Sequence, residues 1–181
     1  MSRAYFSYLE TGLGFSLLSW QEDKLRAFIL PQKSKEKALS IFQKQARFSF
    51  CLRPQEKSPF PYLEERVQNY FEGYPVSFTT YPFYLDDLPP FTREVLKATA
   101  LIPYGKTITY GQLAEKIGKP RASRAVGRAL GQNPLPLLIP CHRVTARYDW
   151  GGYSTYGLRF KILLLSIESR PNPGGSFSPF V

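Results

Sequence analysis

The sequence predicts an α/β (α+β) protein, with a small N-terminal β-sheet and its helices followed by a mostly helical C-terminal domain that contains a helix-turn-helix. Three observations predict this class. The first half of the chain alternates aromatic-rich extended segments with amphipathic helical segments. The second half carries short helical segments separated by glycine and proline. The chain has 181 residues, of which 43% are hydrophobic and 21% charged, so it can bury one sizeable core or two small ones and is not mainly disordered.

The first half is expected to contain strands and two helices. Ser34 can cap the first helix, and the second is expected over about residues 61–71, where apolar residues recur at the spacing of one buried helix face. Gly73 ends this second helix. The expected strands, which are rich in aromatic and aliphatic side chains, cover residues 4–9, 15–20, 25–30 and 47–52.

Residues 74–90 are rich in proline, threonine and aromatic side chains without a helical period, which indicates an extended crossing between two domains. We place the domain boundary near Leu85. Residues 1–85 are then an N-terminal α/β support domain. Residues 86–169 form a second domain, in which short helical segments replace the alternation of strands and helices. Residues 170–181 are rich in proline and glycine and are expected to form a loose tail.

Short helices begin the second half, and the sequence indicates where they start and stop. Thr92 is expected to cap a helix that continues through about Ala100. Thr109 and Gln112 have the spacing of a capping box, in which each side chain bonds to the backbone of the other residue. Gly118 ends the helix that this box begins.

The next helix is expected from Pro120, in its first turn, to Leu130. Two short helices joined by a tight glycine-containing turn predict a helix-turn-helix, whose second helix contacts DNA. The side of this helix that faces away from the core combines arginines with small residues that let the backbone approach phosphates. An ordinary solvated basic face is the other interpretation, and spacing alone does not separate the two. The face consists of Arg121, Ser123, Arg124, Gly127, Arg128 and Gly131.

The overall charge favours the DNA interpretation. The chain has 24 Lys and Arg against 14 Asp and Glu, a formal net charge of +10, which indicates a polyanionic partner. Two cysteines far apart, Cys51 and Cys141, and one histidine, His142, exclude a disulfide scaffold and the usual four-ligand zinc sites. We therefore expect no metal and no cofactor. Without an apolar run of membrane-spanning length or a leader, we expect no membrane partner and a reducing, cytoplasmic compartment.

The chemical centre is predicted where the only histidine follows the second cysteine. A short apolar run, residues 137–139, is followed by Pro140, Cys141, His142 and Arg143. Because a thiol has a pKa of about 8.5, a nucleophilic Cys141 needs a nearby base and positive charge, which His142 and Arg143 can supply. The other interpretation is a buried structural cysteine, since neighbours in sequence often point apart.

Four motifs, in order, resemble those of the O6-alkylguanine-DNA alkyltransferases, a family of direct-reversal DNA repair proteins. The resemblance covers roughly Pro89 to Glu168. It implies that the alkyl group of O6-alkylguanine, with O4-alkylthymine as a further candidate, is transferred irreversibly from duplex DNA to a protein cysteine, one lesion per monomeric molecule. The motifs are residues 108–114, 123–127, 133–134 and 139–144.

The resemblance implies the following catalytic roles. Cys141 is the alkyl acceptor, and His142 takes the thiol proton through a water molecule. Glu168, placed by a final helix that contains Lys161, orients and charges His142. Tyr110 hydrogen-bonds the base and donates a proton to the departing guanine.

The resemblance also implies DNA and base contacts. Arg124 fills the gap left when the damaged nucleotide rotates out of the duplex. The remaining DNA contacts are Arg121, Ser123, Ala125, Val126, Gly127 and Arg128, with the small residues against the minor groove and Arg128 on phosphate. Asn133 hydrogen-bonds backbone before the cysteine turn, and the carbonyl of Val144 faces the guanine amine. Because residues 151–157 are one residue longer than the family pattern, three residues compete for the pocket: Tyr153, Ser154 and Tyr156.

Two other functions fit parts of the sequence. The first is a non-catalytic DNA-binding protein, either a regulator or a lesion sensor. Such sensors resemble this family but lack the cysteine, whereas Cys141 is present. The second is a cysteine hydrolase that uses Cys141 and His142, which would also need an oxyanion hole that no motif marks. Neither alternative accounts for the four ordered motifs.

Overall fold

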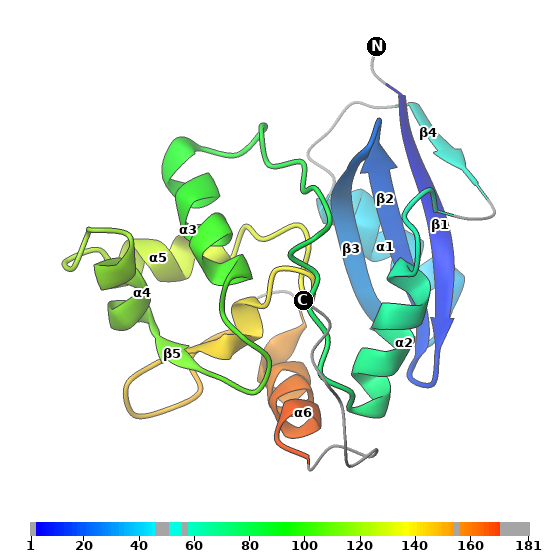
Figure 1. Ribbon diagram of the computed structural model, residues 1–181. Helices are drawn as coiled ribbons and strands as arrows, with labels where there is room; N and C mark the ends of the chain where they lie inside the picture. Colours follow the sequence, from blue (N-terminus) through cyan, green and yellow to red (C-terminus); the bar gives the residue numbers. More distant parts are fainter. Residues whose placement is uncertain (1–2, 46–50, 56–57, 154–155, 171–181) are drawn as a thin grey trace.

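The computed structural model describes residues 3–45, 51–55, 58–153 and 156–170. Its N-terminal part is built on a four-stranded sheet in the order β3-β2-β1-β4 (Figure 1). Strands β1, β2 and β3 pair antiparallel, and β4 pairs parallel to β1 after a helical crossover. The strand bounds are Arg3–Thr11 (β1), Gly14–Gln21 (β2), Lys24–Gln32 (β3) and Cys51–Pro54 (β4). The three predicted N-terminal strands are confirmed, whereas most of the expected strand 47–52 lies outside the described residues.

One helix covers each face of this sheet. Helix α1 (Lys35–Gln45) packs against β2 and β3 through a small cluster that includes Leu17, Ile29 and Phe42. Helix α2 (Leu63–Glu72) lies on the opposite side, in front of the sheet in Figure 1. Successive residues of a strand point to opposite faces of the sheet. The strand residues that point to the α2 side therefore belong to the larger core, which continues into the C-terminal part. Gly73 caps α2 with φ +96°, as its position predicts.

The C-terminal part is mostly helical, as predicted. Helices α3, α4 and α5 pack on one another, and α6 lies between them and α2 (Figure 1). A short parallel pair, β5 and β6, brings the start of α4 beside the cysteine turn. The bounds are Pro90–Ala100 (α3), Ile108–Thr109 (β5), Tyr110–Lys116 (α4), Ser123–Leu130 (α5), Cys141–Arg143 (the 3₁₀ turn η1), Val144–Thr145 (β6) and Gly157–Glu168 (α6).

Two predicted helix starts are wrong. Helix α3 starts at Pro90 with Pro89 as its N-cap, so Thr92 lies inside the first turn with its side chain buried. A proline at the first helical position costs no hydrogen bond, since that N–H has no partner within the helix. Pro120 lies in a turn before α5, closed by a hydrogen bond from the Ala122 N–H to the Lys119 carbonyl at 2.9 Å.

The capping box is confirmed. The Gln112 N–H donates to Oγ1 of Thr109 at 3.1 Å, and the Thr109 N–H donates to Oε1 of Gln112 at 2.7 Å. Helix α4 ends at Lys116, and Gly118 follows with φ +69°, in the left-handed conformation that glycine adopts most readily. The box therefore fixes the start of α4, whose first residue, Tyr110, belongs to the site.

The outer edge of β3, at the end of the sheet, is where the two parts of the chain meet. The N–H of Leu25 donates to the Pro82 carbonyl, and the N–H of Phe28 donates to the Pro134 carbonyl, each at 2.9 Å. These contacts satisfy donors that an edge strand would otherwise leave unpaired. They also hold the segment before the cysteine turn against the sheet, so the sheet supports the site.

Residues 171–181, most of the predicted tail, lie outside the described residues. Within the part of the chain that the structure describes, no helix is long and apolar enough to cross a membrane.

Candidate active site

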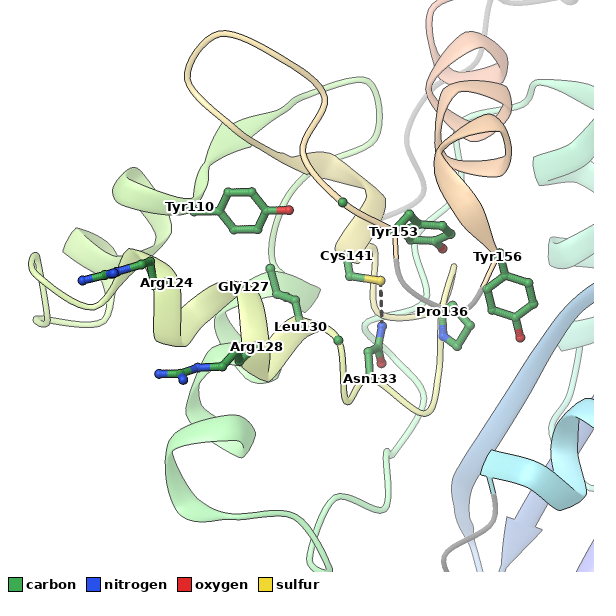
Figure 2. A pocket seen from close by; sticks show the side chains of 12 residues that line it. Tyr110, Arg124, Gly127, Arg128, Leu130, Asn133, Pro136, Cys141, Tyr153 and Tyr156 are labelled. Atoms are coloured by element: carbon green, nitrogen blue, oxygen red, sulfur yellow. Dashed lines mark hydrogen bonds between the residues drawn. The ribbon is translucent and has the colours of Figure 1, made fainter.

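Cys141 lies at the start of η1, and its sulfur points into a pocket of about 490 Å³ (Figure 2). The thiol is nearly buried, with 8% of the residue exposed. A pocket of this size is in the range that holds small organic ligands. Its walls come from α4, α5, the segment before η1 and the loop before α6. The lining residues are Tyr110, Arg124, Gly127, Arg128, Leu130, Gly131, Asn133, Pro136, Cys141, Gly152, Tyr153 and Tyr156.

Asn133 contacts the thiol directly. Its Nδ2 lies 3.1 Å from Sγ of Cys141 and donates to the carbonyl of Ile139 at 2.9 Å. Burial raises the pKa of the Cys141 thiol, while the hydrogen bond from Asn133 and the charge of Lys161 act in the opposite direction. Because burial prevails, the sulfur is a protonated thiol at neutral pH and needs a base to become a nucleophile.

His142 is that base candidate, and Glu168 holds it. Nε2 of His142 lies 2.7 Å from Oε1 of Glu168, and both residues are buried. Nδ1 of His142 is buried and makes no hydrogen bond among the described residues. Burial lowers the pKa of His142, although Glu168 acts against this shift, so the imidazole is neutral at pH 7 and able to accept a proton.

Three further groups surround the Glu168 carboxylate at the end of α6. Arg143 donates through Nε and Nη2 at 3.0–3.1 Å, and the Gly105 N–H donates to Oε2 at 3.0 Å. The hydroxyl of Tyr70, from α2, donates to Oε1 at 2.7 Å. Burial alone would raise the pKa of Glu168, but the hydrogen bonds and charges of His142 and Arg143 lower it to about 2. The carboxylate is therefore ionised at neutral pH.

Tyr110 lies across the pocket from Cys141 (Figure 2). Burial raises its pKa, so the phenol keeps its proton at neutral pH. Gly151 has φ +68°, and a Cβ there would lie 2.7 Å from the Tyr110 hydroxyl oxygen. Only glycine allows the loop to approach the phenol this closely. Tyr110 is thus fixed with a proton to donate into the pocket.

Of the three residues that the sequence offers as candidates for the pocket wall, two line the pocket. Tyr153 and Tyr156 both belong to its wall, with Tyr156 near Pro136 at the end toward the sheet (Figure 2). The Tyr156 hydroxyl accepts a hydrogen bond from the Leu30 N–H on β3 at 3.3 Å. Ser154, the third candidate, lies outside the described residues.

Lys161 is a buried cation behind the pocket. Its Nζ donates to the carbonyl of Val144 at 2.7 Å and to that of Gly152 at 3.4 Å. Burial lowers its pKa to about 8, and the proximity of Cys141 acts against this shift. The Val144 carbonyl, predicted to face a guanine amine, therefore already accepts one hydrogen bond from Lys161.

The predicted arginines gather on one surface of α5 and the turn before it. Arg121, Arg124 and Arg128 are exposed and line a second, open groove, which borders the pocket through Arg124 and Arg128. Ser123 and Ala125 are partly exposed on the same helix. The side chain of Val126 is fully buried in the core that anchors the helix, so its predicted place against the minor groove concerns the backbone of α5. Gly127 lines the pocket, where its lack of a side chain leaves room beside Tyr110.

Tyr70 is a site residue that no sequence motif identifies. It lies on the buried face of α2, and its hydroxyl reaches His142 and Glu168 across the interface between the two parts of the chain. The available signal was chemical: a tyrosine hydroxyl on a buried face needs a hydrogen-bond partner. Arg143 was considered only as a charge near the thiol, whereas it holds Glu168.

Comparisons with known proteins agree with this arrangement. The family described as "6-O-methylguanine DNA methyltransferase, DNA binding domain" matches residues 90–170. A methylated-DNA--protein-cysteine methyltransferase of Saccharolobus islandicus is 42% identical over 113 residues, which cover 62% of this chain and 72% of the relative. One of Methanocaldococcus jannaschii is 51% identical over 82 residues, 45% of this chain and 47% of the relative.

The structural similarity extends over both parts of the chain. The crystal structure of Mycobacterium tuberculosis OGT in complex with DNA has a TM-score of 0.70 and 27% identity, and the match covers 91% of this chain and 92% of that one. It therefore includes the N-terminal sheet, which the family match at residues 90–170 leaves out. A cysteine pocket beside an arginine-bearing helix, the identity to the curated relatives and the shared two-part fold lead to one conclusion: this chain belongs to the methylated-DNA--protein-cysteine methyltransferase family.

Proposed function

We propose that the protein repairs DNA by transferring the alkyl group of O6-alkylguanine in a duplex to Sγ of Cys141. One observation carries this assignment: the thiol opens into a base-sized pocket that borders exposed arginines of a helix-turn-helix. The pocket explains where an extruded base is held, and the arginines explain how the duplex is held beside it. The activity of the curated relatives, named as methyltransferases that act on DNA and a protein cysteine, supports the same reaction.

The proton path starts from the protonated thiol. Nδ1 of His142 accepts the proton, through a bridging water, while Glu168 stabilises the imidazolium that forms. Asn133 and Lys161 stabilise the thiolate by a hydrogen bond and by charge. The neutral imidazole and the ionised carboxylate are the protonation states that this step needs.

The transfer step is an in-line displacement at the alkyl carbon. The bond from Sγ to carbon forms as the bond from carbon to O6 breaks, and the electron pair of the broken bond stays on guanine. Tyr110 donates its proton to the guanine, and the imidazolium returns a proton to Tyr110 through solvent. The products are guanine and a thioether on Cys141. Because a thioether is a poor leaving group, each protein molecule reacts once and no cofactor is consumed.

Reaching O6 requires that the nucleotide rotate out of the duplex, since O6 is buried in the base stack. Arg124 lies at the pocket edge and is exposed, which suits a side chain that occupies the space left in the duplex. Ser123, Ala125 and Gly127 are small enough to let α5 enter the narrow minor groove, and Arg121 and Arg128 reach the flanking phosphates. Such docking recognises the duplex without reading its sequence.

Alkylguanine specificity, a monomeric state and a reducing cytoplasmic compartment are parts of this proposal. A reducing compartment suits a protein whose activity requires a free thiol at Cys141. The cysteine pocket and the arginine groove lie side by side on one chain, which suits action as a monomer.

The test is intact mass after mixing the protein with an excess of duplex DNA that contains one O6-methylguanine. The matched control is Cys141→Ala, and unmodified duplex is the second control. A gain of one methyl group per molecule, in the wild type only, supports the proposal. Binding of the lesion duplex without any mass gain would assign a sensor instead. Repeated turnover of an ester or peptide substrate would assign a hydrolase.

A further inference from the structure

Tyr70 comes from the N-terminal part of the chain and reaches the proton path of the C-terminal part. It lies on α2, is fully buried, and its hydroxyl is 2.7 Å from Oε1 of Glu168 and 3.2 Å from Nε2 of His142. Its ring packs edge-on against His142, with centroids 6.3 Å apart. Burial and the nearby Glu168 raise the pKa of the phenol well above its usual value, so the hydroxyl stays protonated. The contact spans 98 residues of sequence.

The hydroxyl proton can go to only one of these neighbours. The carboxylate of Glu168 is the stronger acceptor and the closer one, so the Tyr70 proton points to Oε1. The Tyr70 oxygen then faces Nε2 of His142 as an acceptor. With two acceptors around it, Nε2 must carry the imidazole proton, and Nδ1 is left with its lone pair free. Nδ1 is also the nitrogen that makes no hydrogen bond among the described residues.

We propose that Tyr70 is a positioning residue for proton transfer: its hydroxyl holds the Glu168 carboxylate against His142 and, together with Glu168, favours the tautomer whose Nδ1 accepts the thiol proton of Cys141. The proposal rests on the proposed function, because it assigns His142 as the base of that reaction. It gives the N-terminal part a direct role in the chemistry of the site.

Other ionisable groups face the same network from each neighbouring element. Arg143 on η1 donates to Glu168, Lys161 on α6 lies near Cys141, and Tyr104, before β5, is close to Glu168 and Arg143. Each of these groups keeps its contact when only the Tyr70 hydroxyl is removed. A change in Tyr70→Phe therefore reports on that hydroxyl, because the phenylalanine ring retains the packing of the tyrosine.

The experiment uses the fact that His142 is the only histidine of the chain. Protein labelled with ¹⁵N at histidine gives one pair of imidazole signals, whose shifts report the tautomer and the pKa of His142 without any reaction. We expect the Nε2–H tautomer in the wild type. In Tyr70→Phe, Glu168 loses a competing donor and binds Nε2–H more strongly, so we expect the pKa of His142 to rise.

The kinetic readout is the single-turnover rate of methyl transfer as a function of pH. We expect Tyr70→Phe to slow the pH-independent rate about tenfold, a barrier change typical of one buried hydrogen bond to a charged group. The acidic limb of the profile should move to higher pH, in step with the pKa of His142. Affinity for the lesion duplex should not change, because Tyr70 lies away from the arginine groove.

Tyr104→Phe is the matched control. Its hydroxyl donates at 3.2 Å to the Gly73 carbonyl and at 3.4 Å to that of Ile167, so it also ties the end of α2 to α6. Its removal is expected to lower stability without shifting the acidic limb. If Tyr70→Phe and Tyr104→Phe lose the same rate and neither shifts the acidic limb of the rate–pH profile, Tyr70 contributes only packing. That result would overturn the proposal.

The tautomer measurement keeps the proposal testable if Tyr70→Phe does not fold. An Nδ1–H tautomer in the wild type would overturn it, whatever the variant does. If the proposed function is wrong, the wild type shows no mass gain with lesion DNA, which is a different outcome from those above. The imidazole nitrogen shifts of wild type and Tyr70→Phe then still show whether Tyr70 changes the tautomer or the pKa of His142.

Discussion

The side-chain amide of Asn133 donates both to the sulfur of Cys141, at 3.1 Å, and to the backbone that precedes it. Its carbonyl oxygen accepts from the Leu135 N–H at 3.0 Å, so the side chain also fixes the turn after α5. One residue thus joins the DNA-facing helix, the cysteine turn and the reacting atom. A hydrogen bond to sulfur is strengthened when the sulfur becomes a thiolate, so Asn133 favours the reactive form.

Replacement of Asn133 should therefore raise the pKa of the Cys141 thiol and slow methyl transfer. In Asn133→Asp the acceptor for Leu135 is kept, but the donor is lost and a carboxylate stands beside the thiolate. We expect this variant to lose at least tenfold in single-turnover rate, a barrier increase of about 1.4 kcal/mol. The pH dependence of thiol alkylation by iodoacetamide measures the pKa of Cys141 directly.

Asn133→Ala separates charge from the lost hydrogen bonds. It removes the same donor without adding a carboxylate, so its thiol pKa should lie between those of the wild type and Asn133→Asp. It should also be less stable by about 1–3 kcal/mol, since the Leu135 N–H loses its acceptor and the Ile139 carbonyl keeps only the hydrogen bond from the Cys141 N–H. A thiol pKa that is the same in all three proteins would show that Asn133 only holds the turn.

Most of the fold could be predicted because its signals are local. The antiparallel strands β1 to β3 follow from aromatic and aliphatic runs, the first two separated by Gly12 and Gly14, and the start of α4 follows from Thr109 and Gln112, three positions apart. The start of α3 was misplaced because two local signals compete there. Thr92 has good cap chemistry, but the proline at residue 90 is tolerated only at the helix start.

The site could be predicted where a residue belongs to a sequence motif, and this includes the distant Tyr110 and Glu168. Cys141, His142 and Asn133 lie in one stretch, and the structure places them around the pocket and its base. Tyr70 meets Glu168 only because α2 packs against α6, and no sequence spacing encodes that contact. The helical period places Val126 on the core side although arginines flank it in sequence, and its side chain is buried there.

Arg128 is expected to contact a DNA phosphate. It is exposed beside Arg121 and Arg124, in the groove along α5. Each phosphate contact releases bound counterions, so Arg128→Ala should reduce the slope of log affinity against log salt by about 0.9. The exposed Lys37 on α1 lies outside this groove, and Lys37→Ala is the control. An unchanged slope for Arg128→Ala would remove Arg128 from the interface.

Tyr156 is expected to limit the size of the alkyl group. Its ring forms the pocket wall near Pro136, and its hydroxyl is tied to the Leu30 N–H of β3, so the ring is not free to move away. Tyr156→Ala should raise the rate for a bulky group such as O6-benzyl relative to O6-methyl. Tyr156→Phe keeps the ring and should keep the wild-type preference. If both variants show the same ratio of rates, the ring does not set the limit.

Glu168 should make the folded state sensitive to acid. Its pKa is about 2 when folded, against 4.5 for the ordinary side chain, so the unfolded chain binds more protons between these values. The stability that the carboxylate contributes is complete above pH 4.5 and is lost as the pH falls toward 2. Glu168→Gln leaves Arg143 buried without a counter-charge and should cost about 3–5 kcal/mol at pH 7. Urea unfolding of both proteins should show this difference shrinking as the pH falls. A difference independent of pH would contradict the assignment.

Alkylation of Cys141 should destabilise the protein that has reacted. The thiol is 8% exposed and lies 3.1 Å from Nδ2 of Asn133, so a methyl group on sulfur that turns away from the pocket must displace this neighbour or the turn that carries it. Adding one carbon to a packed site costs about 1–3 kcal/mol. For a chain of this size each kcal/mol lowers the Tm by roughly 2–4 °C. Calorimetry of protein shown by mass to carry one methyl group should therefore give a Tm lower by several degrees.

The strain from this methyl group should reach the DNA-facing helix. Asn133 follows α5 closely, so amide exchange at Ala129 and Leu130 should become faster in the methylated protein. Cys141→Ala treated with the same lesion DNA controls for bound product, because it cannot accept the alkyl group. An unchanged Tm in protein of confirmed mass would mean that the pocket accommodates the thioether without strain. A lowered Tm with faster exchange confined to the turn before η1 would mean that the strain stops short of α5.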